Sequence, residues 1–305
     1  MRIVLALGGN ALLRSNDDGT VESELKRAKQ SLQPIETLLS GREKILITHG
    51  NGPQVGNALL RVESSIPKTP PRPLDHLVSD TQGGLGYLLE RVIRNLISKN
   101  DSSREVLAML AQVEVDADEE TFLNAIKPIG PYYPVENEKE LENKKWRLRK
   151  TDKGLRRLVP SPKPKKVVEL EIIRSLFENR VLVITAGGGG TPVIMTENGY
   201  EGVEGVIDKD SVASLLACEL NATHLIIATD VDNVWVGKEK TPLEKITKDE
   251  IKLYYEKGEF PEGSMGPKVE AGIQFLERGG EMTIITSTEK ISLALQGEAG
   301  TIITN

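Results

Sequence analysis

Two lysines stand where a positive charge is unfavourable unless an anion accompanies it. Lys209 lies in Ile207-Asp208-Lys209-Asp210 and Lys268 follows Pro267, and apolar residues at helical spacing come after each segment. A cation in the first turn of a helix opposes the helix dipole, by roughly 0.3–1 kcal/mol at an exposed site. One such lysine is an ordinary surface residue. Two of them, each beside a glycine or aspartate loop, favour a site that an anionic ligand completes.

Three glycine clusters follow short, apolar, β-rich runs. Gly8-Gly9-Asn10 follows residues 3–7, Gly50-Asn51-Gly52 follows residues 45–47, and residues 187–190 are all glycine after a run at 181–184. In an open parallel sheet, loops at the carboxyl ends of strands line the ligand crevice, and glycine there lets amide groups approach an anion. One cluster is an ordinary tight turn, but three on one chain favour a shared anion or phosphate pocket.

Phosphoryl transfer uses this combination of groups. Its transition state spreads negative charge over several oxygens, and backbone amides, lysines and Mg²⁺ stabilise it without a histidine base. Lys127, before Pro128, is a third candidate lysine. The chain has no P-loop, no dinucleotide fingerprint and no protein-kinase signature; the nearest match, residues 50–56, is one residue too long. A kinase built from these residues must belong to another lineage.

The periodicity predicts an α/β protein with helices on both faces of a sheet. Helical spacing covers residues 21–39, 85–96 and 168–176, with Ser79 or Asp80 placed to cap the second. Two further helices would follow Asp208 or Asp210 as cap and begin at Pro267. Besides the three runs before the glycine clusters, strands are expected at residues 106–111, 225–229, 282–286 and 301–304.

Residues 127–166 do not alternate in this way. Prolines at both margins flank a charged middle, residues 136–153. The segment could be an interdomain linker, a disordered loop or a small lid. Because forty structureless residues are unusual in a compact domain, a small folded lid is preferred. Trp146 lies among lysines and arginines there and is interpreted as part of a solvated lid surface.

Composition excludes several classes of protein. The 305 residues are 38% hydrophobic and 28% charged, as in globular chains, and the formal net charge of −6 argues against nucleic-acid binding. No apolar run is long enough for a membrane span, and residues 1–7 read as a buried strand rather than a signal peptide. The single cysteine, Cys218, excludes an internal disulfide framework and indicates a reducing cytosol. Three histidines leave little for a metal site, so none is expected; His49 and His224 are interpreted as framework.

Eight motifs, in order along nearly the whole chain, closely resemble the carbamate kinases of the amino-acid kinase family. The octapeptide at residues 49–56 and Ser161-Pro162-Lys163-Pro164 are much more specific to carbamate kinases than the others, which acetylglutamate or uridylate kinases could share. The remaining six lie at residues 8–12, 127–131, 186–192, 206–210, 229–232 and 263–268.

The resemblance implies a three-layer α/β/α sandwich around a mainly parallel sheet of about eight strands. Residues 1–207 would hold carbamate, with the lid at about 127–166 inserted, and residues 208–305 would hold ATP or ADP. The implied enzyme is a cytoplasmic homodimer of arginine metabolism. It would transfer a phosphoryl group reversibly between carbamoyl phosphate and ADP, with Mg²⁺ carried by the nucleotide phosphates.

The resemblance also implies roles for individual residues. Lys209 and Lys268 would neutralise the transferred phosphoryl group, Asp210 would orient them, and Lys127 would reach in from the lid. Carbamate and the moving phosphate would be held at Gly8, Gly9, Asn10, Gly50, Asn51, Gly52, Gly188 and Gly189. The nucleotide would be bordered by Thr229, Asp230, Val234, Trp235, Met265 and Gly266.

Four departures from the family pattern concern the nucleotide loop and the lid. Leu155 stands where a tryptophan is usual, Trp235 replaces a tyrosine, residues 233–242 are shorter than usual, and residues 79–81 are not the common small ones. Two alternatives therefore remain: another family kinase acting on a different small carboxylate or phosphate, and a non-catalytic nucleotide sensor. A sensor has no need of all the catalytic lysines together with Asp210.

Overall fold

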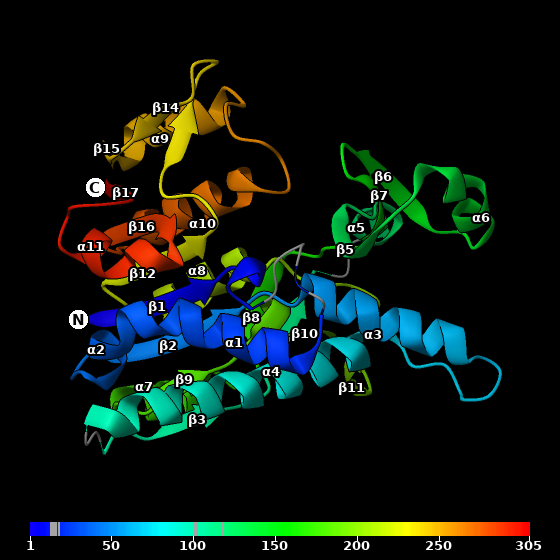
Figure 1. The fold of residues 1–305 in the computed structure, drawn as a ribbon, viewed down its shortest axis with the longest axis horizontal. Helices are drawn as coiled ribbons and strands as arrows, with labels where there is room; N and C mark the ends of the chain where they lie inside the picture. The colour runs from blue at the N-terminus through cyan, green and yellow to red at the C-terminus, as the bar shows by residue number, and fades with distance from the viewer. Residues whose placement is uncertain (13–16, 18, 101–102, 117–118) are drawn as a thin grey trace.

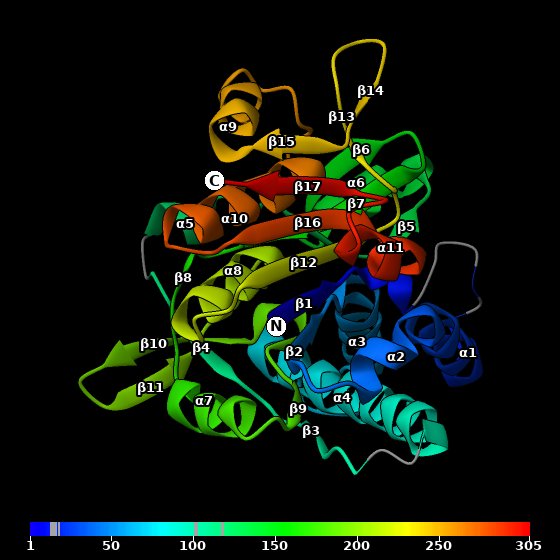
Figure 2. The same ribbon diagram turned by 90° about the vertical axis from the view of Figure 1, so that its left-hand side faces the viewer.

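An eight-stranded sheet forms the centre of the structure (Figures 1 and 2), a computed structural model that describes residues 1–12, 17, 19–100, 103–116 and 119–305. Every neighbouring pair of strands is parallel except β16 and β17. The order is β15 (Lys245–Thr247), β17 (Thr301–Thr304), β16 (Met282–Ser287), β12 (His224–Thr229), β1 (Arg2–Leu7), β2 (Lys44–His49), β9 (Leu182–Ile184) and β3 (Val106–Ala108).

Helices cover both faces of this sheet, so the molecule has three layers. Along β1, Ile3, Leu5 and Leu7 enter one buried apolar cluster, whereas Val4 and Ala6 enter another. This alternation follows from the two-residue period of a strand. The first cluster is completed by α1 (Val21–Leu32), α2 (Glu36–Ser40), α4 (Leu74–Ile97) and α11 (Ile291–Leu295), and the second by α7 (Leu170–Glu178), α8 (Lys209–Glu219), α9 (Lys248–Glu256) and α10 (Met265–Glu277).

The predicted α/β class and mainly parallel sheet are confirmed, and all seven expected strands lie in it. The eighth, β15, was missed because it is only three residues long and mostly exposed. The single helix expected over residues 21–39 is wrong: α1 ends at Leu32, and a 3₁₀ turn containing Pro34 separates it from α2. Proline has no amide hydrogen with which to continue a helix.

Two helix starts also differ from expectation. Helix α4 begins at Leu74, after Pro73, so Ser79 and Asp80 lie inside it and do not cap it. Helix α10 begins at Met265, which makes Pro267 its third residue; Lys268 still lies in the first turn. None of the described helices is both long and apolar enough to cross a membrane.

The segment after residue 126 folds into a small antiparallel sheet that protrudes from the body (Figure 1). Its strands are β5 (Lys127–Tyr133), β6 (Arg147–Thr151) and β7 (Gly154–Val159), with α6 (Glu138–Asn143) between the first two. We call β5 to β7 with α6 the lid. Residues 164–167 form β8 in a separate sheet with β4 (Gln112–Val115), β10 (Thr191–Thr196) and β11 (Gly199–Gly202).

The lid is anchored to α3 (Gly52–Ser65) at close range. A Cβ atom on Gly56 would lie 2.0 Å from Cα of Gly130, so only glycine fits at this crossing of α3 and β5. Arg157 on β7 donates from Nη1 to Oε1 of Glu63 on α3 at 2.6 Å. Trp146 packs beneath that guanidinium, 4.1 Å from ring centroid to Cζ, and is half-buried. The interpretation of Trp146 as solvated surface is therefore wrong.

Candidate active site

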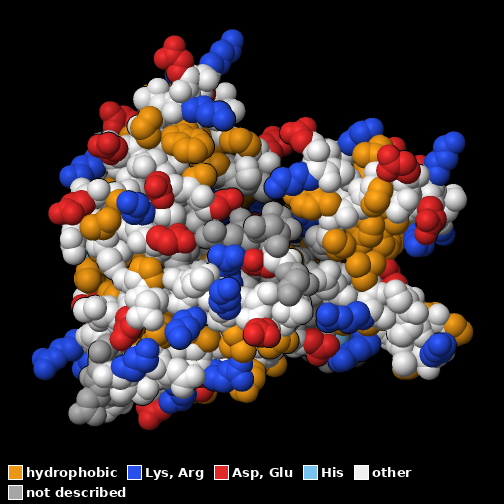
Figure 3. All heavy atoms as spheres, in the orientation of Figure 1, with side chains coloured by type: hydrophobic (Ala, Val, Ile, Leu, Met, Phe, Trp, Pro, Cys, Tyr) orange, Lys and Arg blue, Asp and Glu red, His pale blue; other side chains and the backbone are white. Residues whose placement is uncertain are grey.

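A cavity of about 690 Å³ lies where the carboxyl ends of β1, β2 and β12 meet the lid. Its walls combine the glycine loops of the first part of the chain with residues around the start of α10 and the hairpin of β13 (Val234–Val236) and β14 (Thr241–Leu243). The notch between body and lid is visible in the space-filling view (Figure 3). The sheet topology thus brings together segments that are distant in sequence.

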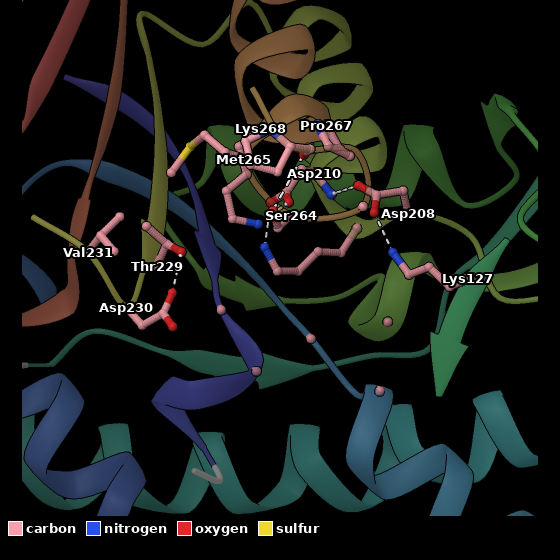
Figure 4. A pocket seen from close by; sticks show the side chains of 18 of the residues that line it. Lys127, Asp208, Asp210, Thr229, Asp230, Val231, Ser264, Met265, Pro267 and Lys268 are labelled. Atoms are coloured by element: carbon pink, nitrogen blue, oxygen red, sulfur yellow. Dashed lines mark hydrogen bonds and ion pairs between the residues drawn. The ribbon is translucent and has the colours of Figure 1, made fainter. Parts of the chain in front are cut away.

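One carboxylate at the start of α8 holds two lysines (Figure 4). Oδ1 of Asp210 forms an ion pair with the ammonium of Lys209, and Oδ2 forms one with the ammonium of Lys268 at 2.8 Å. The side chains of all three are largely buried. The helix is capped by Asp208, whose Oδ1 accepts from the amides of Asp210 at 2.9 Å and Ser211 at 3.4 Å. Of the two caps considered from the sequence, Asp208 is the one used.

The three side chains of this trio shift one another's pKa values. Burial alone would raise the pKa of the Asp210 carboxyl, but the charges of Lys209 and Lys268 outweigh burial and hold that pKa below its usual value. Burial lowers the pKa of Lys209. For Lys268, burial acts in the same sense, but Asp210 and Asp208 raise its pKa overall. These shifts favour the ionised form of Asp210 and the charged form of Lys268.

Lys127 joins the lid to the same group of charges. It is the first residue of β5, and its ammonium pairs with Oδ2 of Asp208 (Figure 4). Burial would raise the pKa of Asp208, and Lys127 is the main group that lowers it below its usual value. One aspartate therefore caps α8 with one oxygen and ties down the lid with the other.

The glycine loops lie against one another at the cavity floor. A Cβ on Gly8 would lie 2.8 Å from the carbonyl oxygen of Ala228, and one on Gly50 would lie 3.0 Å from the amide nitrogen of Gly9. Gly8, Gly9, Gly50, Asn51 and Gly52 all line the cavity. The amide of Gly50, however, donates to the carbonyl oxygen of Leu7 at 3.0 Å, so it supports the loop and not a ligand.

Residues 187–190 close the floor from the other side. Gly188 lines the cavity with a φ of +67°, and a Cβ there would lie 2.1 Å from Nδ2 of Asn51. Gly189 does not line it: its backbone packs against Ile207, and its amide donates to the carbonyl of Ala186 at 3.0 Å. Gly189 was expected to bind substrate, but in the structure it packs against the protein interior. The backbone of Asn10 lies in a 3₁₀ turn, Gly9–Ala11, and its side chain is outside the described part of the chain.

The amide side chain of Asn51 is used by the framework. Its Nδ2 donates to Oγ1 of Thr81 at 2.9 Å, and Thr81 in turn donates to the carbonyl of Val78 at 2.7 Å. Asn51 is buried, and this bond fixes the orientation of its side chain at the cavity. Thr81 lies in the segment whose sequence departs from the family pattern, and nothing in the sequence indicated this pairing.

The opposite wall carries most of the residues expected to border a nucleotide. Thr229, Asp230, Trp235 and Met265 line the cavity, and the Thr229 hydroxyl donates to Asp230 at 3.1 Å (Figure 4). Two expected members do not line it. Val234 is fully buried and its amide donates to Oγ1 of Thr301 at 2.8 Å, and the amide of Gly266 donates to the carbonyl of Pro261 at 3.0 Å.

Four charged lining residues were not expected at the site: Asp208, considered from the sequence only as a helix cap, and Arg156, Lys240 and Glu259. The only signal for Arg156 was its place in an arginine pair, Arg156-Arg157. Lys240 and Glu259 carry no pattern by which the sequence could have placed them at a site.

The carboxylates that line the cavity fit a metal ion that arrives bound to the substrate better than one held permanently by the protein. Among the described residues, no three of His, Cys, Asp or Glu cluster as a metal site. Asp208 and Asp210 line the cavity, but lysine ammonium groups already occupy them. Mg²⁺ usually keeps several waters and binds substrate phosphates rather than an all-protein cage.

The chain is similar to known proteins over nearly its entire length. The model of the amino acid kinase family matches residues 1–287. A carbamate kinase of Pyrococcus horikoshii is 41% identical over 310 residues, covering 99% of each chain. Structures of the Giardia lamblia carbamate kinase, one bound to citric acid and one to AMP-PNP, are each 36% identical, cover 99% of this chain and 98% of that one, and have TM-scores of 0.95 and 0.90.

His49, at the end of β2, should make stability depend on pH. Burial lowers the pKa of His49 to about 4, because the ring is enclosed and only the carbonyl of Gly50, 3.1 Å from Nδ1, opposes this. Between pH 6.5 and 4 the unfolded chain binds a proton that the folded chain does not. The free energy of unfolding should therefore fall by about 3 kcal/mol as pH falls through that window.

Urea unfolding across pH 4–8 measures this effect. In His49→Gln, the fall between pH 6.5 and 4 should be smaller than in the parent by about that amount. The matched control is His76→Gln, since His76 is exposed, and its curve should run parallel to the parent. If the pH dependence of the free energy of unfolding were the same in His49→Gln as in the parent, His49 would not be the group responsible.

Proposed function

Because this chain belongs to the amino acid kinase family, we propose that it is a kinase acting on carbamate. In the ATP-forming direction, the bond between phosphorus and the carbamate oxygen of carbamoyl phosphate breaks. A bond from a β-phosphate oxygen of ADP to the same phosphorus forms, giving ATP and carbamate. Relatives named carbamate kinases match over the whole length of the chain.

The observation that carries the proposal is the lysine pair on Asp210. Lys209 and Lys268 come from different helices, yet one carboxylate holds both against the cavity. We propose that they neutralise the phosphoryl group as it moves, the step at which charge stabilisation matters most. Both possible nucleophiles, carbamate and the ADP phosphate, are already anions, so no general base is needed. Lys127 would complete the cationic wall from the lid.

The two substrates would enter from opposite walls. We propose that carbamate binds in the part formed by residues 1–207, at the backbone of Gly9, Asn51 and Gly52, next to Gly188. The nucleotide would bind in the part formed by residues 208–305, along Thr229, Asp230, Trp235 and Met265. The supporting observation is that residues of both sets line one cavity together with the lysines. Mg²⁺ would arrive with the nucleotide, held by its phosphates, and supply further positive charge.

We also propose that the protein is a cytoplasmic homodimer. Support comes from one end of the central sheet. Strand β3 is the terminal strand there, and it exposes Leu107, with Leu110 just beyond it and Tyr87 on the neighbouring helix α4. An edge strand with exposed apolar side chains is a surface that a second copy of the chain can cover.

Sedimentation velocity tests the dimer. The parent protein should sediment at about 67 kDa, twice the 33.5 kDa of one chain, and Leu107→Glu should shift it toward the monomer because a charge would be buried. Leu253→Glu, which changes an exposed leucine on α9, is the control. A monomeric parent, or a dimer indifferent to Leu107→Glu, would exclude this surface.

The reaction itself is tested by adding carbamoyl phosphate, ADP and Mg²⁺ to the purified protein and following ATP by luciferase. ATP should appear in proportion to enzyme and carbamoyl phosphate. If no ATP forms while another acyl phosphate gives it, the substrate is not carbamate. Binding of ADP without turnover on any acyl phosphate would point to a nucleotide sensor.

Replacing either lysine should affect chemistry more than binding. In Lys209→Ala and Lys268→Ala, we expect kcat to fall by at least about 100-fold, while the dissociation constant of ADP, from calorimetry, changes by less than about threefold. Lys257→Ala, at an exposed site, should behave as the parent. Near-parental turnover in either variant would remove that lysine from the catalytic set.

A further inference from the structure

Two adjacent arginines on the lid strand β7 have opposite surroundings. Arg157 is satisfied, since it bonds to Glu63 on α3 and stacks on Trp146. The side chain of Arg156 lines the cavity. Alternation along a strand separates the two, because successive side chains point to opposite faces of a sheet. One arginine thus anchors the lid, and the other faces the substrates.

Arg156 has no acidic partner within the described part of the chain. Its guanidinium lies over the ring of Tyr132, 4.8 Å from the centroid, and its Nε is buried without a hydrogen-bond acceptor. Lys127, Lys209 and Lys268, by contrast, each have a carboxylate. A buried donor left unsatisfied is costly, so its presence at a ligand cavity indicates that something else supplies the acceptor.

A second arginine adds to the positive charge next to Arg156. Arg149 on β6 stands directly opposite Arg156 in the antiparallel register, and like charges at such positions repel. Nη1 of Arg149 reaches the far wall, where a Cβ on Gly263 would lie 3.2 Å from it. Arg149 of the lid therefore reaches the loop before α10, while Arg156 lines the cavity beside it. An anion between the lid and the body would offset their repulsion.

The chemistry of the two groups narrows the choice of anion. A guanidinium presents two parallel N–H donors that match two oxygens of a phosphate, which a lysine ammonium cannot do. Gly52, on the proposed carbamate side of the cavity, lies close to the lid, because a Cβ there would be 3.9 Å from the carbonyl oxygen of Pro128 on β5. An acyl phosphate placed there would bring its phosphate to both Arg156 and Lys127.

We propose that Arg156 binds the phosphate group of the acyl phosphate substrate and so draws the lid over it. The proposal rests on the proposed function, since it takes carbamoyl phosphate as that substrate. Arg156 binds the phosphate before transfer and contributes chiefly to affinity. The nucleotide phosphates are the other source of the same chemistry, and the measurements below separate the two.

Steady-state kinetics and calorimetry on the full chain test this role. In Arg156→Gln, the KM for carbamoyl phosphate should rise by about 10- to 100-fold, the loss expected for a charged hydrogen-bonding pair. The dissociation constant of phosphonoacetamide, in which a methylene replaces the bridging oxygen and blocks transfer, should rise equally. The dissociation constant of ADP should stay within about twofold. Arg156→Lys keeps the charge but loses the fork, so it should recover part of the affinity.

The control is Arg147→Gln, which removes the same charge from an exposed position on β6 and should leave all three constants unchanged. Thermal unfolding identifies any variant that fails to fold; Arg156→Lys then carries the test. Unchanged phosphonoacetamide affinity in Arg156→Gln, or a loss confined to ADP, would overturn the proposal. A parent that makes no ATP from carbamoyl phosphate would instead refute the proposed function, and calorimetry would still report on Arg156.

Discussion

The buried carboxylate of Asp210 is the interaction on which the site depends. Two ammonium groups enclosed together would repel each other, and Asp210 offsets this repulsion by accepting one on each oxygen while its own pKa is held below the usual value. Removing one member of a buried ion pair typically costs about 3–5 kcal/mol, because the partner is left charged without compensation. The same first turn of α8 carries Asp208, which ties in Lys127 and with it the lid. Substrate charge is thus met by lysines already fixed in place.

The parallel sheet supplies the geometry that this arrangement needs. Strands β1, β2 and β12 end at the same edge, and glycine lets their loops touch: Gly8 meets the backbone of Ala228, and Gly50 meets Gly9. Any larger side chain would hold these loops apart. Trp235 of the β13–β14 hairpin is the one aromatic side chain among the described residues that line the cavity, and Tyr132 of the lid lies under the Arg156 guanidinium.

Much of this architecture follows from local pattern. The seven expected strands were visible as apolar runs because strands buried on both faces read as continuous hydrophobic segments. Glycine after strands and lysine at helix starts marked the cavity, and the family resemblance supplied the substrate that physical pattern left open. What the pattern could not supply depends on neighbours: that the amide of Gly50 is taken by Leu7, and that Asn51 turns to Thr81. In the same way, Arg156 and Arg157 are indistinguishable in the sequence. They differ only in their contacts in the folded protein, where Arg157 meets Glu63 and Arg156 lines the cavity.

The position of β1 has a consequence for how the protein folds. Strand β1 lies between β2 and β12 in the sheet, although residues 8–223 separate it from β12 along the chain. Contacts between residues so distant in sequence form late, since loop closure must come first. Until β12 has paired with β1, the loop at Gly8 lacks the backbone of Ala228 against which it packs. The floor of the cavity therefore depends on long-range strand pairing and not on the local sequence of either loop.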